Sequence, residues 1–161
     1  MFSNDLLGQF EMLCRTIFSF LIDRYEYVFY EANSFNGILY WVTFKNKTTA
    51  VKCSYDIREG LDVSVIRLSN KKPPISMIED VFPIETLVRV YGVDIKIDRS
   101  KLEESRKYNV LDVSGSESVL VQYAGILKQY GNEVLLGDFS AFDGVIKERR
   151  EFMKQRKMIF P

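Results

Sequence analysis

The strongest signal for the fold lies in residues 38–65, which read ILYWVTFKNKTTAVKCSYDIREGLDVSV. Three runs of alternating side chains occur in this stretch, separated by short turns at Asn46-Lys47 and between Asp56 and Gly60. Alternation with a period of two is typical of β-strands, and turns this short join antiparallel neighbours. The stretch therefore predicts three consecutive strands of an antiparallel meander.

Two further segments alternate in the same way. Tyr25, Tyr27 and Phe29 precede the meander, and residues 93–98 read VDIKID. Each segment is long enough for one more short strand. We therefore expect a sheet of four to six strands.

Helices are predicted toward both ends of the chain. Residues 4–22 and residues 139–153 place apolar side chains at the three- and four-residue spacing of amphipathic helices, and a polar loop containing two prolines is expected at residues 69–76. We expect a single α+β domain over residues 1–161. Its antiparallel meander is packed mainly on one face by the N-terminal and C-terminal helices.

The charge balance limits the classes of partner. The chain has 161 residues, of which 22 are basic and 22 acidic, so its formal net charge is zero. Nucleic-acid binders carry an excess of cations to neutralise phosphates, so no nucleic-acid partner is expected. No run of about 18 apolar residues occurs and the first residues, MFSND, lack the basic region of a secretory signal. We therefore expect a cytoplasmic protein with no membrane partner.

The sequence offers little for catalysis or for metal binding. It contains no histidine, which removes the commonest general base and the usual partner of serine and cysteine nucleophiles. Cys14 and Cys53 form no metal-binding or redox motif, and we expect both to be buried as free thiols. Asp94 and Asp98 share one face of the strand expected at 93–98, a spacing that fits a cation site or an acid–base pair but fits a solvated sheet face better. No catalytic residue, cofactor or metal site is assigned.

Two other patterns have both a functional and a structural interpretation. Aromatic side chains on an open sheet face stack nucleic-acid bases, but the surroundings here are not basic, so we favour core packing; the aromatic residues concerned are Tyr40, Trp41, Phe44 and Tyr55. Residues 147–157 contain six cations, which form a phosphate- or partner-contacting patch or complement the carboxyl end of the last helix. We favour the second interpretation.

The order of the elements suggests a family. A leading helix and an aromatic meander are followed by YAGIL at residues 123–127 and LLGDFSAF at residues 135–142, before a basic last helix. This layout resembles small bacterial immunity-type proteins of polymorphic or contact-dependent toxin systems. The resemblance implies a non-enzymatic protein that neutralises a cognate toxin by direct binding, and it carries over no binding residue.

The candidate contact residues therefore come from charge alone. Asp56, Glu59 and Asp62 cluster at one hairpin end, and Glu79 and Asp80 follow the proline-containing loop. We predict that these five acids bind a protein partner, possibly a toxin domain, because acidic loops steer association with a basic surface. Each acid taken singly is also explained as solvated loop charge.

Two alternative functions stay open. The first is a homo-oligomeric structural or regulatory adaptor, encoded by a phage or within an operon, that associates through an uncovered aromatic face. The second is a histidine-free enzyme that uses carboxylates. A concave pocket with two close acids of raised pKa favours the enzyme, a flat or convex acidic face favours the inhibitor, and an exposed apolar patch favours the oligomer.

Overall fold

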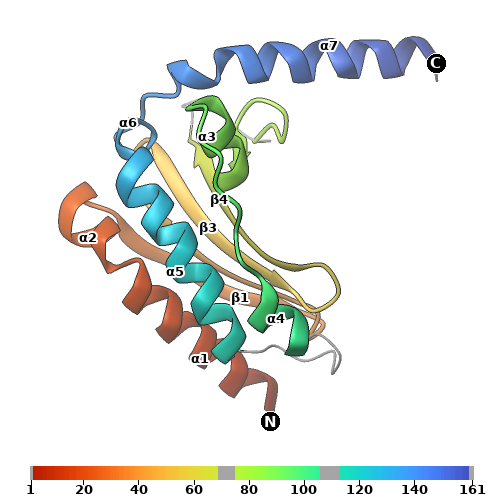
Figure 1. The fold of residues 1–161 in the computed structure, drawn as a ribbon. Coiled ribbons are helices and arrows are strands. Elements are labelled where there is room, and N and C mark those ends of the chain that lie inside the picture. Colours follow the sequence, from red (N-terminus) through yellow and green to blue (C-terminus); the bar gives the residue numbers. More distant parts are fainter. Residues whose placement is uncertain (1, 69–74, 106–112, 160–161) are drawn as a thin grey trace.

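The centre of the structure is a five-stranded antiparallel sheet in the order β1-β2-β3-β4-β5 (Figure 1). The computed structural model describes residues 2–68, 75–105 and 113–159. The strands are β1 (Val28–Phe35), β2 (Leu39–Lys45), β3 (Thr49–Asp56), β4 (Gly60–Arg67) and β5 (Val81–Pro83). The predicted α+β class and antiparallel meander are confirmed. Most of the loop expected at residues 69–76 lies outside the described residues.

The register of the sheet explains why its strands alternate. On one face Val42 pairs with Cys53, which pairs with Val63, and all three are fully buried. On the other face Trp41 pairs with Ser54, which pairs with Asp62, and none of these is buried. The sheet therefore has one covered apolar face and one open face, as an antiparallel sheet with helices on one side requires.

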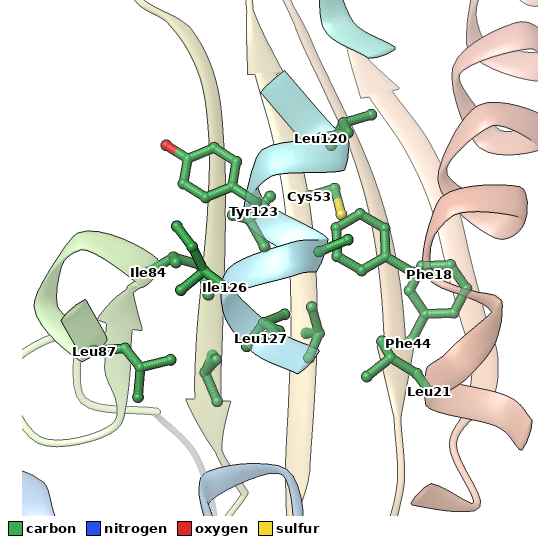
Figure 2. Packing of buried hydrophobic residues seen from close by; sticks show 14 of the residues in the cluster. Phe18, Leu21, Phe44, Cys53, Ile84, Leu87, Leu120, Tyr123, Ile126 and Leu127 are labelled. Atoms are coloured by element: carbon green, nitrogen blue, oxygen red, sulfur yellow. The ribbon is translucent and has the colours of Figure 1, made fainter. Parts of the chain in front are cut away.

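Helices α1 (Phe2–Ile17) and α5 (Val113–Tyr130) cover the apolar face (Figure 1). Phe10 of α1 meets the Tyr55 ring edge-on, at 6.4 Å between ring centres. Leu120 and Leu127 of α5 belong to the same buried cluster as Phe44 of β2 (Figure 2). Burial of each large apolar side chain of this kind contributes about 1.5–3 kcal/mol, so this layer is the main source of stability.

The first helical segment is interrupted, in contrast to the continuous helix predicted over residues 4–22. Helix α1 ends at Ile17, and α2 (Ser19–Tyr25) begins after Phe18. Residues two apart on a continuous helix point in nearly opposite directions, yet Phe18 and Phe20 are both buried. The break at Phe18 reorients the chain so that both rings reach the core.

Short helices complete the fold: α3 (Ile84–Val90), α4 (Ser100–Ser105), α6 (Asn132–Leu135) and the 3₁₀ turn η2 (Ser140–Phe142). The strand predicted at residues 93–98 is wrong, because this segment pairs with no strand. Its backbone is held by a side chain instead: the Asp98 N–H donates to the Gln122 amide oxygen at 2.8 Å, and the Gln122 amide nitrogen donates to the Asp98 carbonyl at 2.8 Å. The alternation of residues 93–98 reflects one partly buried side of an extended segment.

Helix α7 (Asp143–Ile159) does not take the covering position that the sequence suggested for the last helix. That position beside α1 belongs to α5, and α7 runs outward from the end of the molecule where α3 lies (Figure 1). Only Val145 and Ile146, in its first turn, are buried. Amphipathic spacing predicted a last helix over residues 139–153, but the helix begins at Asp143 and extends to Ile159, and the spacing did not reveal which surface it contacts.

Candidate functional site

The β3–β4 turn gathers three of the five predicted contact acids at one end of the sheet. Asp56 accepts the backbone N–H groups of Arg58 at 2.8 Å and Glu59 at 3.4 Å, and these bonds hold the pKa of its carboxyl below the usual range. Its carboxylate also lies 3.5 Å from the Arg58 guanidinium. Asp56 therefore shapes the turn, while Glu59 and Asp62 project from it as exposed side chains.

A second chain segment brings a cation and another acid to the same place. Arg99 donates from one terminal nitrogen to the Leu61 carbonyl at 2.7 Å, and its other terminal nitrogen lies 3.2 Å from Glu85 and 3.9 Å from Asp62. The Tyr123 hydroxyl donates to Glu85 and accepts a hydrogen bond from Arg99. The segment that precedes α4 is thereby tied to β4, α3 and α5.

The electrostatic balance at Asp62 is not neutral. Partial burial and the charges of Glu85 and Glu59 raise the pKa of the Asp62 carboxyl, and the Arg99 charge only partly offsets them. One guanidinium thus serves two carboxylates, and a net negative charge remains. We call Asp56, Glu59, Asp62 and Glu85 the acidic surface.

The acidic surface is open. The side chain of Asp62 is 66% exposed and that of Glu85 is 49% exposed. A hollow of about 360 Å³ beside α3 has Glu85 on its wall, but Asp62 does not line it. Enzymes bury most of a small substrate in a concave site, so an open pair of acids suits contact with a protein surface better than it suits turnover.

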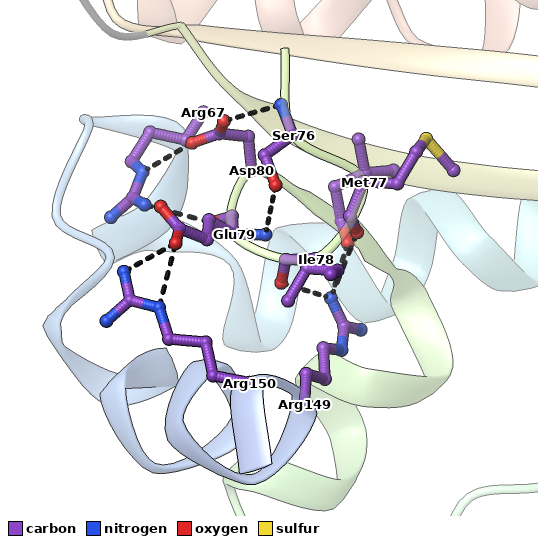
Figure 3. Close-up of polar contacts among 9 residues, drawn as sticks. Arg67, Ser76, Met77, Ile78, Glu79, Asp80, Arg149 and Arg150 are labelled. Atoms are coloured by element: carbon purple, nitrogen blue, oxygen red, sulfur yellow. Dashed lines mark hydrogen bonds and ion pairs between the residues drawn. The ribbon is translucent and has the colours of Figure 1, made fainter. Parts of the chain in front are cut away.

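The other two predicted acids lie elsewhere (Figure 3). Asp80 is buried, accepts the Ser76 N–H at 2.9 Å and pairs with Arg67 at 3.1 Å. Glu79 pairs with Arg150 of α7 at 2.6 Å. Arg67 ends β4 and Asp62 lies near its start, a separation of about 17 Å for five residues of strand. The five acids therefore form two separate groups, and the group at Glu79 and Asp80 holds a turn and a helix in place.

The remaining sequence patterns have structural explanations. Asp98 accepts the Ser100 N–H at 3.0 Å at the start of α4, and this bond lowers the pKa of its carboxyl. In the described part of the chain, no group of three or more acidic or cysteine side chains is placed to hold a metal ion. Cys14 and Cys53 are buried free thiols, as predicted.

The aromatic stacking platform is also not assembled. Tyr40, Phe44 and Tyr55 are buried on the covered face, as the core-packing interpretation requires. Trp41 alone lies on the open face, where its ring nitrogen donates to Glu31 at 3.1 Å and Lys52 lies 5.3 Å from its ring centre.

The sequence did not indicate that Arg99, Glu85 and Tyr123 belong to this site. Arg99 and Glu85 are 14 positions apart in the chain, and Tyr123 and Glu85 are 38 positions apart. One signal was available. In the sequence Tyr123 recurs with Leu120 and Leu127 at the three- and four-residue spacing of an apolar helix side, and a buried tyrosine hydroxyl needs a polar partner. The identity of that partner depends on tertiary contacts that no local pattern encodes.

Comparison with known proteins adds no relative. Among the described helices none is long and apolar enough to cross a membrane. The chain matches no protein-family model, no curated protein and no solved structure.

Proposed function

We propose that this protein is a non-enzymatic, cytoplasmic protein-binding protein, and specifically an immunity protein that neutralises a cognate bacterial toxin by direct binding. The observation that carries the proposal is the acidic surface. Four carboxylates gather at one end of the sheet, where the start of β4 meets α3, and one arginine only partly offsets the charge at Asp62.

The physical argument concerns rigidity and charge. An inhibitor needs a preformed surface, because ordering a flexible loop on binding costs free energy that subtracts from affinity. Asp56 fixes the β3–β4 turn and Arg99 fixes the neighbouring segment, so the acids are held before a partner arrives. A toxin that acts on nucleic acid presents cations to its substrate, and a fixed negative surface attracts and covers those cations.

The experiment is co-expression of the tagged protein with the product of the neighbouring gene, followed by affinity capture and a growth assay. Stoichiometric capture of one toxin fragment together with restored growth supports the proposal. Recovery of the protein alone, with no protection of growth, contradicts it.

A pair of charge-reversal variants tests the surface. Glu59→Lys/Asp62→Lys is expected to weaken toxin binding about ten- to a hundredfold, mainly through slower association. The matched control is Asp23→Lys/Glu26→Lys, which changes the net charge by the same amount on exposed residues of and just after α2, at the other end of the sheet. Equal binding by both variants would place the toxin contact outside the acidic surface.

A self-associating adaptor is the second candidate. The observation in its favour is the open sheet face, where Phe35 is 61% exposed and Trp41 is only partly covered. Recovery of only more copies of the protein in the capture experiment would favour this function.

A further inference from the structure

Helix α7 is anchored to the body by its first two turns. Arg149 donates to the carbonyls of Ile78 at 3.1 Å and Val81 at 2.9 Å, and Arg150 pairs with Glu79 (Figure 3). Partial burial and the neighbouring charge of Arg89 lower the pKa of Arg149, but Arg149 keeps its charge at neutral pH. The helix therefore leaves the body in a fixed direction.

Beyond this anchor, the apolar stripe of α7 is largely exposed: Phe152 borders the body beside Ile78 and Thr86, and Arg156 lies over its ring at 6.0 Å. Val145, Phe152 and Ile159 are spaced by seven residues and so lie on one side of the helix. Val145 is buried, whereas Phe152 is 59% exposed and Ile159 is 68% exposed. An exposed apolar stripe of this kind is typical of a surface that another molecule covers.

The exposed end of α7 is also strongly basic. Residues 152–159 read FMKQRKMI and contain three cations and no acid. They combine apolar side chains with the charges of Lys154, Arg156 and Lys157. A surface that covers this end therefore has to offer both apolar area and negative charge.

The open sheet face offers both at its acidic end. In the sheet register Phe35 pairs with Leu39, which pairs with Asp56. In the neighbouring row Trp41 and Asp62 lie two strands apart, with Ser54 between them. The apolar side chains thus lie over β1 and β2, and the carboxylates lie beside them over β3 and β4. Four strands span about 14 Å, and eight helical residues span about 12 Å, so the lengths match.

We propose that the exposed end of α7, residues 152–159, docks across the acidic end of the open sheet face of a second copy of this chain. Phe152 and Ile159 cover Phe35, Leu39 and Trp41. Arg156 and Lys157 meet Asp56, Glu59 and Asp62, whereas Lys154, two residues from Phe152, faces away. A twofold axis makes the exchange reciprocal, so each copy gives one helix and receives one.

The contact forms between copies because one chain cannot make it alone. The anchor at Ile78 and Val81 lies beside the end of β4, whereas Asp62 lies near its start. From that anchor α7 points outward from the body (Figure 1). To reach the acidic surface of its own chain, α7 would have to break the bonds that its Arg149 and Arg150 make to the body.

This contact covers acids that also carry the proposed function, and to that extent it rests on that function. Self-association and toxin binding then compete for Asp56, Glu59 and Asp62. The dimer is a resting form that keeps the acidic surface covered until the toxin displaces α7.

The test is sedimentation velocity and light scattering of the full chain from about 1 to 100 µM. The unmodified protein is expected to form a dimer that dissociates as salt screens the charges, for example between 0.1 and 0.5 M. Arg156→Glu/Lys157→Glu and Glu59→Lys/Asp62→Lys are each expected to weaken self-association at least tenfold. The variant that combines all four substitutions is expected to dimerise again, because both charges are reversed.

Arg24→Glu/Lys47→Glu is the control, since it makes the same charge change on exposed residues at the other end of the sheet. A monomer at 100 µM, or a dimer that all these variants leave unchanged, overturns the proposal. Failure of the variant with all four substitutions to dimerise also overturns the proposal. The Arg156→Glu/Lys157→Glu variant keeps every acid, so its capture of a toxin tests the proposed function separately from self-association. If the variant captures a toxin while the unmodified protein forms no dimer, only the proposed self-contact is refuted.

Discussion

The Arg67 guanidinium lies 3.1 Å from the Asp80 carboxylate, and the same arginine donates to the Glu79 carbonyl at 2.9 Å. The other carboxylate oxygen of Asp80 accepts the Ser76 N–H. One buried acid therefore joins the end of β4 to the turn that leads into β5. Asp80, which the sequence suggested as a contact for a partner, therefore helps to hold the edge of the sheet together.

Replacing this acid tests its structural role. Asp80→Ala leaves the Arg67 charge and the Ser76 N–H without their partner, so the free energy of unfolding is expected to fall by about 2–4 kcal/mol. Urea denaturation followed by circular dichroism measures the change.

Glu59→Ala is the matched control, because Glu59 is exposed and its carboxylate makes no ion pair within the described residues. Its effect on unfolding is expected to stay within about 0.5 kcal/mol. Equal stability of the two variants would show that the Arg67–Asp80 pair contributes nothing measurable.

At Gly137 the addition of a single carbon atom is expected to destabilise the fold. Its φ is +96°, and an added Cβ would lie 2.6 Å from the Thr48 hydroxyl oxygen. Gly137→Ala is therefore expected to lower the free energy of unfolding by about 1–3 kcal/mol, through backbone strain and displacement of the β2–β3 turn. Thermal unfolding checks this as a fall in Tm.

Gly125→Ala gives the opposite sign. Gly125 lies inside α5, and nothing stands within 4 Å of its added Cβ. Alanine is a better helix former than glycine, so a gain of about 0.5–1 kcal/mol is expected. A loss of stability in Gly125→Ala would contradict the open space at that position, and an unchanged Tm in Gly137→Ala would contradict the close approach of Thr48.

The two thiols make a chemical prediction. Burial and the neighbouring Cys14 thiol raise the pKa of Cys53 well above its usual value, and both side chains are fully buried. The thiolate is the reactive form, so the native protein is expected to react with Ellman's reagent on the order of a hundredfold more slowly than the protein unfolded in guanidinium.

Ser54→Cys supplies the comparison for the thiols, because Ser54 neighbours Cys53 on β3 and faces the open side of the sheet. This variant is expected to show one fast equivalent in the native state. A fast equivalent in the unmodified protein would mean that α1 opens from the sheet.

The hairpins could be predicted because their information is local. Alternation from Ile38 to Val65 and the turns at Asn46 and Gly60 specify both strand and neighbour. The segment 93–98 has the same alternation but no adjacent partner, and its backbone bonds go to Gln122. The last helix was expected to cover the sheet, but α5 packs there instead. Both helices are amphipathic, and amphipathicity alone does not specify which helix packs on the sheet.

The site was predictable only in part for a similar reason. Asp56, Glu59 and Asp62 are close in sequence and share one turn. Glu85 and Arg99 reach them from distant segments, and Asp80 departs from them along the length of β4. Charge composition indicated an acidic surface, but tertiary contacts decide which acids are available to a partner.

The ionised carboxylate of Asp62 is expected to lower the stability of the fold. Because its pKa is raised above the ordinary 3.8 in the folded protein, the folded state keeps a proton that the unfolded chain loses. Stability contributed by this group is present below about pH 4 and is lost as the pH rises through the folded pKa. Asp62→Asn removes that loss and keeps the side-chain volume.

Asp62→Asn should therefore raise the free energy of unfolding at pH 7 and have no effect near pH 3, when both are measured by urea denaturation. The gain at pH 7 is expected to be below about 1 kcal/mol, because the side chain is largely exposed and solvent screens its charge. Under the proposed function, the same variant should also bind a cognate toxin less tightly. Lower stability at pH 7 would mean that the pair with Arg99, at 3.9 Å, outweighs burial and the charges of Glu85 and Glu59.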